Sequence, residues 1–123
     1  MKKKDRKVLK FGRKNLYLEV GAYTFGGELS ILAYTKNGLY GDITINLNGM
    51  MAEEYGGFIE PLTKSCGLEK RLIEEGIIKE VIGSVSYNLE KYDEVIFDLE
   101  KLKEYDPEGI EEILKEENEE EFE

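Results

Sequence analysis

The chain has 123 residues and a formal net charge of −10, and 41% of its residues are hydrophobic. This length predicts one domain with a real core, and its single cysteine excludes an internal disulfide, which favours a reducing cytoplasm. No apolar run approaches the roughly 18 residues of a membrane span, and no apolar segment follows the basic N-terminus as a signal peptide requires. We therefore expect a cytoplasmic protein that makes no membrane contact.

Charge is segregated along the chain. Eight of the first fourteen residues are Lys or Arg, whereas fifteen of the last thirty-one are Asp or Glu. This pattern predicts a basic N-terminal arm at residues 1–14, a single folded domain at 15–115 and an acidic tail at 116–123. The tail is expected to be disordered because it holds six Glu in eight residues.

The spacing of apolar residues predicts an α+β fold. Residues 48–67 are interrupted by Gly and Pro and are expected to be irregular. A short amphipathic helix is predicted at 68–75, and two C-terminal helices begin at Asp98 and at Asp106-Pro107. We expect one antiparallel sheet of about five strands, with the β-meander first and the helices packed on one face. The strands alternate apolar and polar residues and lie at 16–22, 29–35, 39–47, 77–88 and 94–97.

The turn at Asn37-Gly38 can be tested for register. A two-residue loop would bring apolar residues opposite polar ones on the same face, whereas a three-residue loop over 36–38 pairs Thr35 with Leu39 and keeps the apolar face whole. We prefer the three-residue loop. The same register places Tyr34 opposite Tyr40 on the other face of the hairpin.

The residue types argue against catalysis. The sequence contains no histidine, which is the commonest general base and metal ligand at neutral pH. Zinc would need one cysteine and carboxylates, and neither a calcium loop nor a phosphate-binding glycine loop is present. Adjacent carboxylates on a helix point in different directions and are normally solvated. We therefore expect no enzymatic activity, no cofactor and no bound metal.

The acidic surface favours an interaction with another protein. Carboxylates on helices can occupy a basic groove that normally holds nucleic acid, and complementary charge speeds such an encounter. Solubility is the alternative explanation for this acidity. The residues that we assign to partner binding are Glu53, Glu54, Glu104, Asp106, Glu108, Glu111 and Glu112.

The basic arm supports a second hypothesis, in which the arm grips phosphates and tyrosines on the sheet stack on bases. The rest of the chain is acidic and would repel a polyanion, so nucleic acid is the less favoured direct ligand. The arm can instead aid solubility or fold against the acidic C-terminus, and the tyrosines can be ordinary strand residues. The residues of this second hypothesis are Lys2, Lys3, Lys4, Arg6, Lys7, Lys10, Arg13, Lys14, Tyr34 and Tyr40.

Several segments carry a family resemblance. The string FDLEKLKEYDPEG occupies residues 97–109 and is followed by IEEIL, and the front half contains FG at 11–12, LEVG at 18–21, LSI at 29–31 and YGDITINL at 40–47. Together they resemble a small uncharacterised family, a domain of unknown function. The resemblance implies a cytoplasmic protein carried by conjugative elements and phages of low-GC Gram-positive bacteria, and it implies no catalytic residues.

Small acidic accessory proteins of mobile elements often act against host defence. We therefore expect a non-enzymatic, acidic protein-interaction module of a mobile genetic element that inhibits a host nucleic-acid-binding defence protein, in an anti-CRISPR-like role. Its partner would be a protein with a basic surface, such as a CRISPR effector or another nuclease. The alternative is a nucleic-acid-binding accessory protein that uses the basic arm and the Tyr-bearing sheet face.

Overall fold

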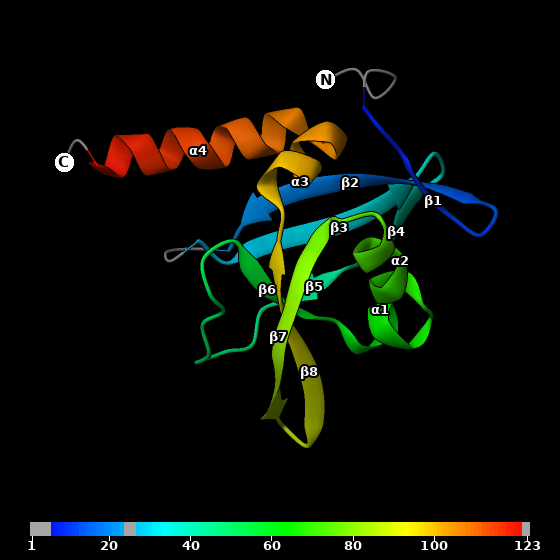
Figure 1. Ribbon diagram of the computed structural model, residues 1–123, viewed down its shortest axis with the longest axis horizontal. Helices are drawn as coiled ribbons and strands as arrows, with labels where there is room; N and C mark the ends of the chain where they lie inside the picture. The colour runs from blue at the N-terminus through cyan, green and yellow to red at the C-terminus, as the bar shows by residue number, and fades with distance from the viewer. Residues whose placement is uncertain (1–5, 24–26, 122–123) are drawn as a thin grey trace.

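The computed structural model describes residues 6–23 and 27–121, and side chains up to residue 116. Two four-stranded antiparallel sheets form the body of the protein (Figure 1). The first has the order β1-β2-β3-β4 and the second the order β5-β6-β8-β7. The strands are β1 (Leu9–Phe11), β2 (Lys14–Ala22), β3 (Leu29–Thr35), β4 (Gly38–Asp42), β5 (Thr44–Ile45), β6 (Gly56–Ile59), β7 (Ile78–Tyr87) and β8 (Glu90–Phe97). The helices are α1 (Pro61–Ser65), α2 (Leu68–Glu74), α3 (Leu99–Tyr105) and α4 (Pro107–Glu121).

The α+β class, the β-meander and the C-terminal helices are confirmed, but the single sheet of five strands is wrong. The segment predicted as one strand at 39–47 is divided between the two sheets at Ile43. The Ile43 amide donates to the Ile31 carbonyl in the first sheet (2.9 Å), while the Ile43 carbonyl accepts from the Glu60 amide beside β5 (3.0 Å). A buried apolar residue thus links the two sheets without leaving either of its backbone groups unpaired.

The β3–β4 hairpin differs from the predicted register at its tip. Thr35 pairs with Gly38 and Tyr34 with Leu39, so the turn contains two residues rather than three. A β-bulge at Tyr40 then restores the expected pairing of Ala33 with Gly41. The bulge satisfies both constraints because it allows a tight turn and still keeps the apolar face whole.

The segment expected to be irregular contains β6, a fully buried strand between β5 and β8. The glycines that suggested a loop are instead needed for close packing. A Cβ added at Gly56 would lie 2.5 Å from the Val95 carbonyl oxygen of the neighbouring strand. Glycine in a strand can mark such a close approach of two backbones.

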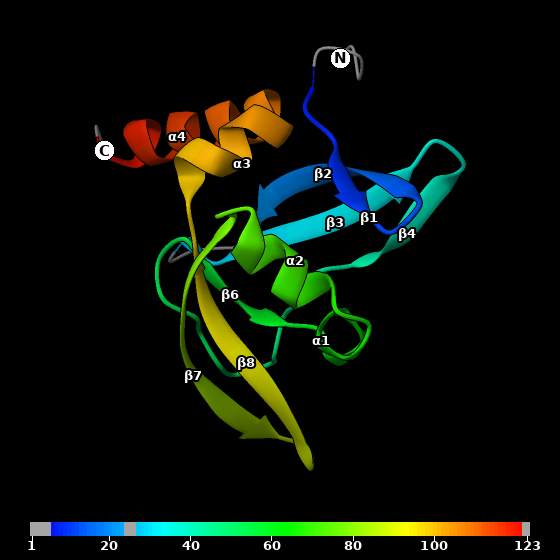
Figure 2. The same cartoon turned by 45° about the vertical axis from the view of Figure 1, so that its right-hand side comes forward.

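The strands predicted at 77–88 and 94–97 form the β7–β8 hairpin, with a longer second strand than expected. Asn88 and Leu89 both have positive φ angles, of 48° and 67°, which suits a two-residue hairpin turn that matches the strand twist. The hairpin projects from the body of the protein (Figure 2).

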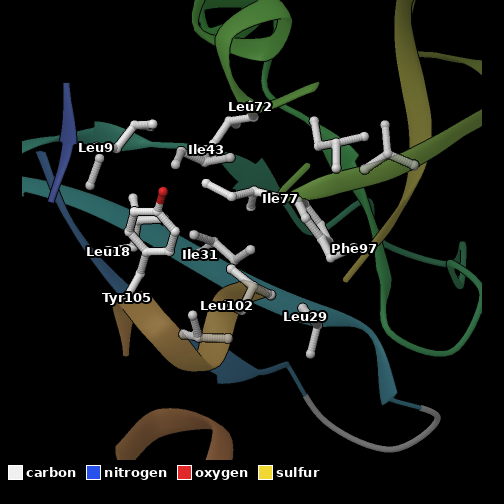
Figure 3. Packing of buried hydrophobic residues seen from close by; sticks show 14 of the residues in the cluster. Leu9, Leu18, Leu29, Ile31, Ile43, Leu72, Ile77, Phe97, Leu102 and Tyr105 are labelled. Atoms are coloured by element: carbon white, nitrogen blue, oxygen red, sulfur yellow. The ribbon is translucent and has the colours of Figure 1, made fainter. Parts of the chain in front are cut away.

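The main core lies between the two sheets and is closed by α2, α3 and α4. Figure 3 shows how side chains from distant parts of the chain meet there. Burial of these apolar side chains is the main favourable contribution to folding. The labelled residues are Leu9, Leu18, Leu29, Ile31, Ile43, Leu72, Ile77, Phe97, Leu102 and Tyr105.

Both expected terminal segments join the fold. From residue 6 the basic arm is part of the domain, because Leu9 of β1 pairs with Leu16 of β2 and both are buried. At the other end, α4 continues to Glu121 rather than stopping at residue 115. Glu favours helix, and extending an anchored helix needs no new nucleation. Residues 1–5 and 122–123 lie outside the described part of the chain.

Candidate functional site

The α3–α4 junction covers part of the β2 edge. β1 pairs only with the first three residues of β2. Farther along that strand, Arg6 donates from Nη2 to the Leu18 carbonyl, and the Val20 amide donates to Asp106 Oδ2 (2.8 Å). Arg6 also donates from Nε to the Tyr105 carbonyl (2.7 Å). These contacts provide hydrogen-bond partners for backbone groups of β2 that β1 does not pair, and they fix the helices against the sheet.

Asp106 is the centre of this junction. It forms an ion pair with Arg6 at 3.4 Å, and the two side chains are only 8% and 4% exposed. Its Oδ1 accepts from the Gly109 amide (3.2 Å), and its carbonyl accepts from the Ile110 amide (3.2 Å). The predicted helix start at Asp106-Pro107 is therefore confirmed. The assignment of Asp106 to partner binding is wrong, because its carboxylate is buried. It already accepts hydrogen bonds from the Gly109 amide of α4 and the Val20 amide of β2, and it pairs with Arg6.

A cavity of about 510 Å³ opens beside the junction, between the start of α4 and β2 and β3. Glu108 and Glu112 line it from α4, one helical turn apart, and Glu19 lines it from β2. Val20 and Leu32 add apolar surface. All three glutamates are exposed. Arg6 also lines the cavity, but its charge is paired with Asp106. The arrangement can therefore receive a long cationic side chain, whose apolar stem would contact the wall and whose charge would meet the three glutamates.

The structure brings only some of the predicted acidic residues together. Glu108, Glu111 and Glu112 are exposed on α4. Glu104 is exposed on α3 but pairs with Lys7 at 3.1 Å. The remaining two, Glu53 and Glu54, are exposed on the loop before β6, not on α3 or α4. Glu19 was missed, because an outward-facing Glu on a strand has no sequence signal that would relate it to a helix 90 residues later.

The basic residues of the second hypothesis also separate into groups. Lys2, Lys3 and Lys4 lie outside the described residues. Arg6 was assigned to nucleic-acid binding, and this is wrong because it is buried against Asp106. Lys7 forms the ion pair with Glu104. The members that are exposed and form no ion pair within the described chain are Lys10, Arg13 and Lys14.

The two tyrosines do not face each other as predicted. Tyr34 pairs with Leu39, whereas Tyr40 is the bulge residue. The Tyr40 ring makes an edge contact with Phe11 at 6.4 Å between centroids, and Lys14 Nζ lies 5.8 Å from its centroid. The bulge moves Tyr40 out of the cross-strand pair, so the expected pair of tyrosines on one face is not formed.

Two glutamates are buried away from the α4 cavity. Burial raises the pKa of Glu28, although its Oε1 accepts from the Ala52 amide (3.3 Å). Burial and the neighbouring Asp93 raise the pKa of Glu69 to about 7. Asp93 in turn pairs with Lys64 at 3.0 Å. Asp93 of β8 thus links α1 and α2 to the second sheet, whereas Glu28, next to β3 of the first sheet, contacts the loop at Ala52. Within residues 6–23 and 27–121, no three Cys, Asp or Glu side chains gather as a metal site.

Comparison with known protein families gives a match for this chain. A family model described as a domain of unknown function, DUF4313, matches residues 17–117. The chain belongs to the DUF4313 family. The DUF4313 match runs from within β2 through most of α4, so it includes Asp106, Gly109 and the three glutamates of the cavity. No match was found among curated proteins or among solved structures. Every helix in the described part of the chain is too short or too polar to cross a bilayer.

Proposed function

We propose that this protein is a non-enzymatic interaction module that binds a basic protein surface through α4. The observation that supports the proposal is the position of Glu108 and Glu112 beside Glu19, around a cavity at the start of α4. Glu111 extends the exposed carboxylates to an adjacent side of the helix. A side chain of Arg or Lys from the partner fits the charge of this site.

Anchoring makes α4 a suitable binding element. The buried contacts of Arg6, Asp106 and Gly109 hold the helix on β2 before any partner arrives. A surface held in its binding conformation loses less conformational entropy on association. Glu108 lies in the first turn of α4, where its charge favours the helix, and Glu112 lies four residues later on the same side of the helix.

The partner class that we propose is a nucleic-acid-binding defence protein, such as a CRISPR effector or another nuclease. These proteins hold nucleic acid in positively charged channels, and an acidic helix presents charge of the same sign as a phosphate backbone. An anti-CRISPR-like inhibitor of this kind would be carried by a mobile genetic element. The genes that neighbour the coding sequence would bear directly on this part of the proposal.

The proposal can be tested with guide-free and guide-loaded CRISPR nucleases immobilised for binding measurements. Glu19→Gln/Glu108→Gln/Glu112→Gln should weaken binding at least tenfold, because close charge pairs across interfaces carry large coupling energies. The control Glu80→Gln/Glu90→Gln/Glu100→Gln removes the same charge from exposed positions outside every residue assigned to partner binding. Equal loss in both variants would show that only net charge matters, and no binding to any nuclease would exclude this partner class.

A further inference from the structure

A second cavity lies at the other end of the first sheet. It has a volume of about 350 Å³ and lies between the β1–β2 turn and the β3–β4 turn. Arg13, Lys14 and Lys36 line it, and no carboxylate is found among its lining residues. Tyr17 contributes the only aromatic ring of that lining. Figures 1 and 2 both show the two turns at one end of the sheet and the C-terminal end of α4 at the opposite end.

The three cations of this cleft lack a carboxylate partner in the part of the chain that the structure describes. Several other cations are neutralised, because Arg6, Lys64 and Arg71 all lie within 4.0 Å of an Asp or Glu oxygen. By contrast, Arg13, Lys14 and Lys36 are exposed and take part in none of these ion pairs. Concentrated, uncompensated positive charge in a concave site raises the local concentration of anions.

Tertiary structure assembles this cleft from distant parts of the chain. Tyr17 of β2 pairs with Tyr34 of β3, which brings the start of β2 beside the end of β3. The β3–β4 turn is held because Thr35 Oγ1 accepts from the Asn37 amide (3.1 Å) and donates to the Gly38 carbonyl (3.3 Å). The cations are therefore presented by two short, hydrogen-bonded hairpins rather than by a loose arm.

We propose that this cleft binds single-stranded nucleic acid. Arg13, Lys14 and Lys36 would contact successive phosphates, and a base would stack on the half-buried ring of Tyr17. A positive groove combined with an aromatic platform is how many proteins hold single strands without sequence preference. The Asn15 side chain, which also lines the cleft, can hydrogen-bond a base edge or a sugar.

The overall charge of −10 does not prevent this interaction. Exposed charges are largely screened beyond a Debye length of about 8 Å at physiological ionic strength. On the face of the sheet that carries Tyr17, the next carboxylates along the neighbouring strands are Glu19 of β2 and Asp42 of β4. Both residues pair with Leu32 of β3, which lies farther from the two turns. The cleft therefore carries a local field whose sign is opposite to that of α4.

The test uses the full chain and a labelled oligothymidylate of about twelve nucleotides, with fluorescence anisotropy as the readout. Arg13→Ala/Lys14→Ala/Lys36→Ala should raise the dissociation constant at least tenfold. The matched control Lys70→Ala/Lys91→Ala/Lys103→Ala removes the same charge from exposed positions elsewhere and should change it less than twofold. For three phosphate contacts, log K should fall with log salt with a slope of about −2, and the cleft variant should lose most of this slope.

Two further measurements separate nucleic acid from any polyanion. Tyr17→Leu should weaken oligonucleotide binding about fivefold or more, whereas Tyr17→Phe keeps the stacking ring and should bind normally. Heparin carries charge but no bases, so its binding should not respond to Tyr17→Leu. Circular dichroism melts establish that each variant is folded. Equal weakening of binding by the cleft variant and the matched control variant, or an unchanged affinity in folded Tyr17→Leu, would overturn the proposal.

Discussion

Asp106→Ala tests whether the buried ion pair anchors the C-terminal helices. The substitution leaves the Arg6 guanidinium buried without a carboxylate, and breaking a buried pair in this way costs about 3–5 kcal/mol. The lower value applies because Arg6 keeps the Leu18 and Tyr105 carbonyls as acceptors. Loss of the cap on α4 adds about 1 kcal/mol. We therefore expect a loss of about 4 kcal/mol in the free energy of unfolding, a large part of the total for a domain of this size.

The measurement is urea denaturation followed by circular dichroism, where this loss should lower the midpoint by about 2 M. Asp98→Ala is the matched control. Asp98 also caps a helix, since its side chain accepts from the Lys101 amide at 3.2 Å, but among the described residues it forms no ion pair. Asp98→Ala should therefore cost only about 1 kcal/mol. Equal losses in the two variants would refute the argument that the Arg6 pair dominates.

Two other changes test the packing of α4 and a buried proton. Gly109→Ala would stabilise an exposed helix by about 1 kcal/mol, but here the added Cβ would lie 2.4 Å from the Val20 carbonyl oxygen and 2.3 Å from Asp106 Oδ2. We expect a loss of about 2 kcal/mol in urea denaturation, and a gain would contradict the close approach. Because the pKa of Glu69 is raised from 4.5 to about 7, its protonated form stabilises the fold below pH 4.5, and this stability is lost as the pH rises through about 7. Glu69→Gln should flatten the decline in the free energy of unfolding between about pH 5 and pH 8, and an unchanged pH profile would assign that decline to other groups.

The opposite charges of the molecule are separated in space as well as in sequence. The α4 cavity is lined by the exposed carboxylates of Glu19, Glu108 and Glu112 beside the buried Arg6–Asp106 pair, whereas the charged residues of the cleft between the two turns are all cations. The two proposed sites are independent, since the substitutions that test one leave the residues of the other unchanged. A partner that carries bound nucleic acid would offer complementary charge to both.

Short-range sequence patterns predicted the strands and helix starts whose formation depends on residues close together in the chain. Alternation in β2 and β3 predicted strands, and Asp106-Pro107 predicted the start of α4, because capping and side-chain alternation depend on neighbouring residues. The same reasoning missed β6, since Gly56-Gly57 is typical of a loop. The Val95 carbonyl, against which Gly56 packs, lies on a strand 39 residues later, and no local pattern reveals it.

The candidate sites show the same division. The sequence correctly predicted that Glu108, Glu111 and Glu112 are exposed, but it treated Asp106 in the same way. Only the pairing of Arg6 with Asp106, across a separation of 100 residues, shows that this carboxylate is structural. Its burial depends on what packs against the helix start, which a count of charges cannot supply.

By itself, the sequence determined the α+β class, the absence of histidine chemistry and the acidic character of the C-terminal helix, because these follow from composition and short-range periodicity. Tertiary structure alone decided how the strands divide into two sheets at Ile43, and which charges are buried. It also decided which charges meet, namely Glu19 with α4 and Lys36 with the β1–β2 turn. The physical reason is that burial and electrostatic fields depend on distances in space, and chain folding sets these independently of distance along the sequence.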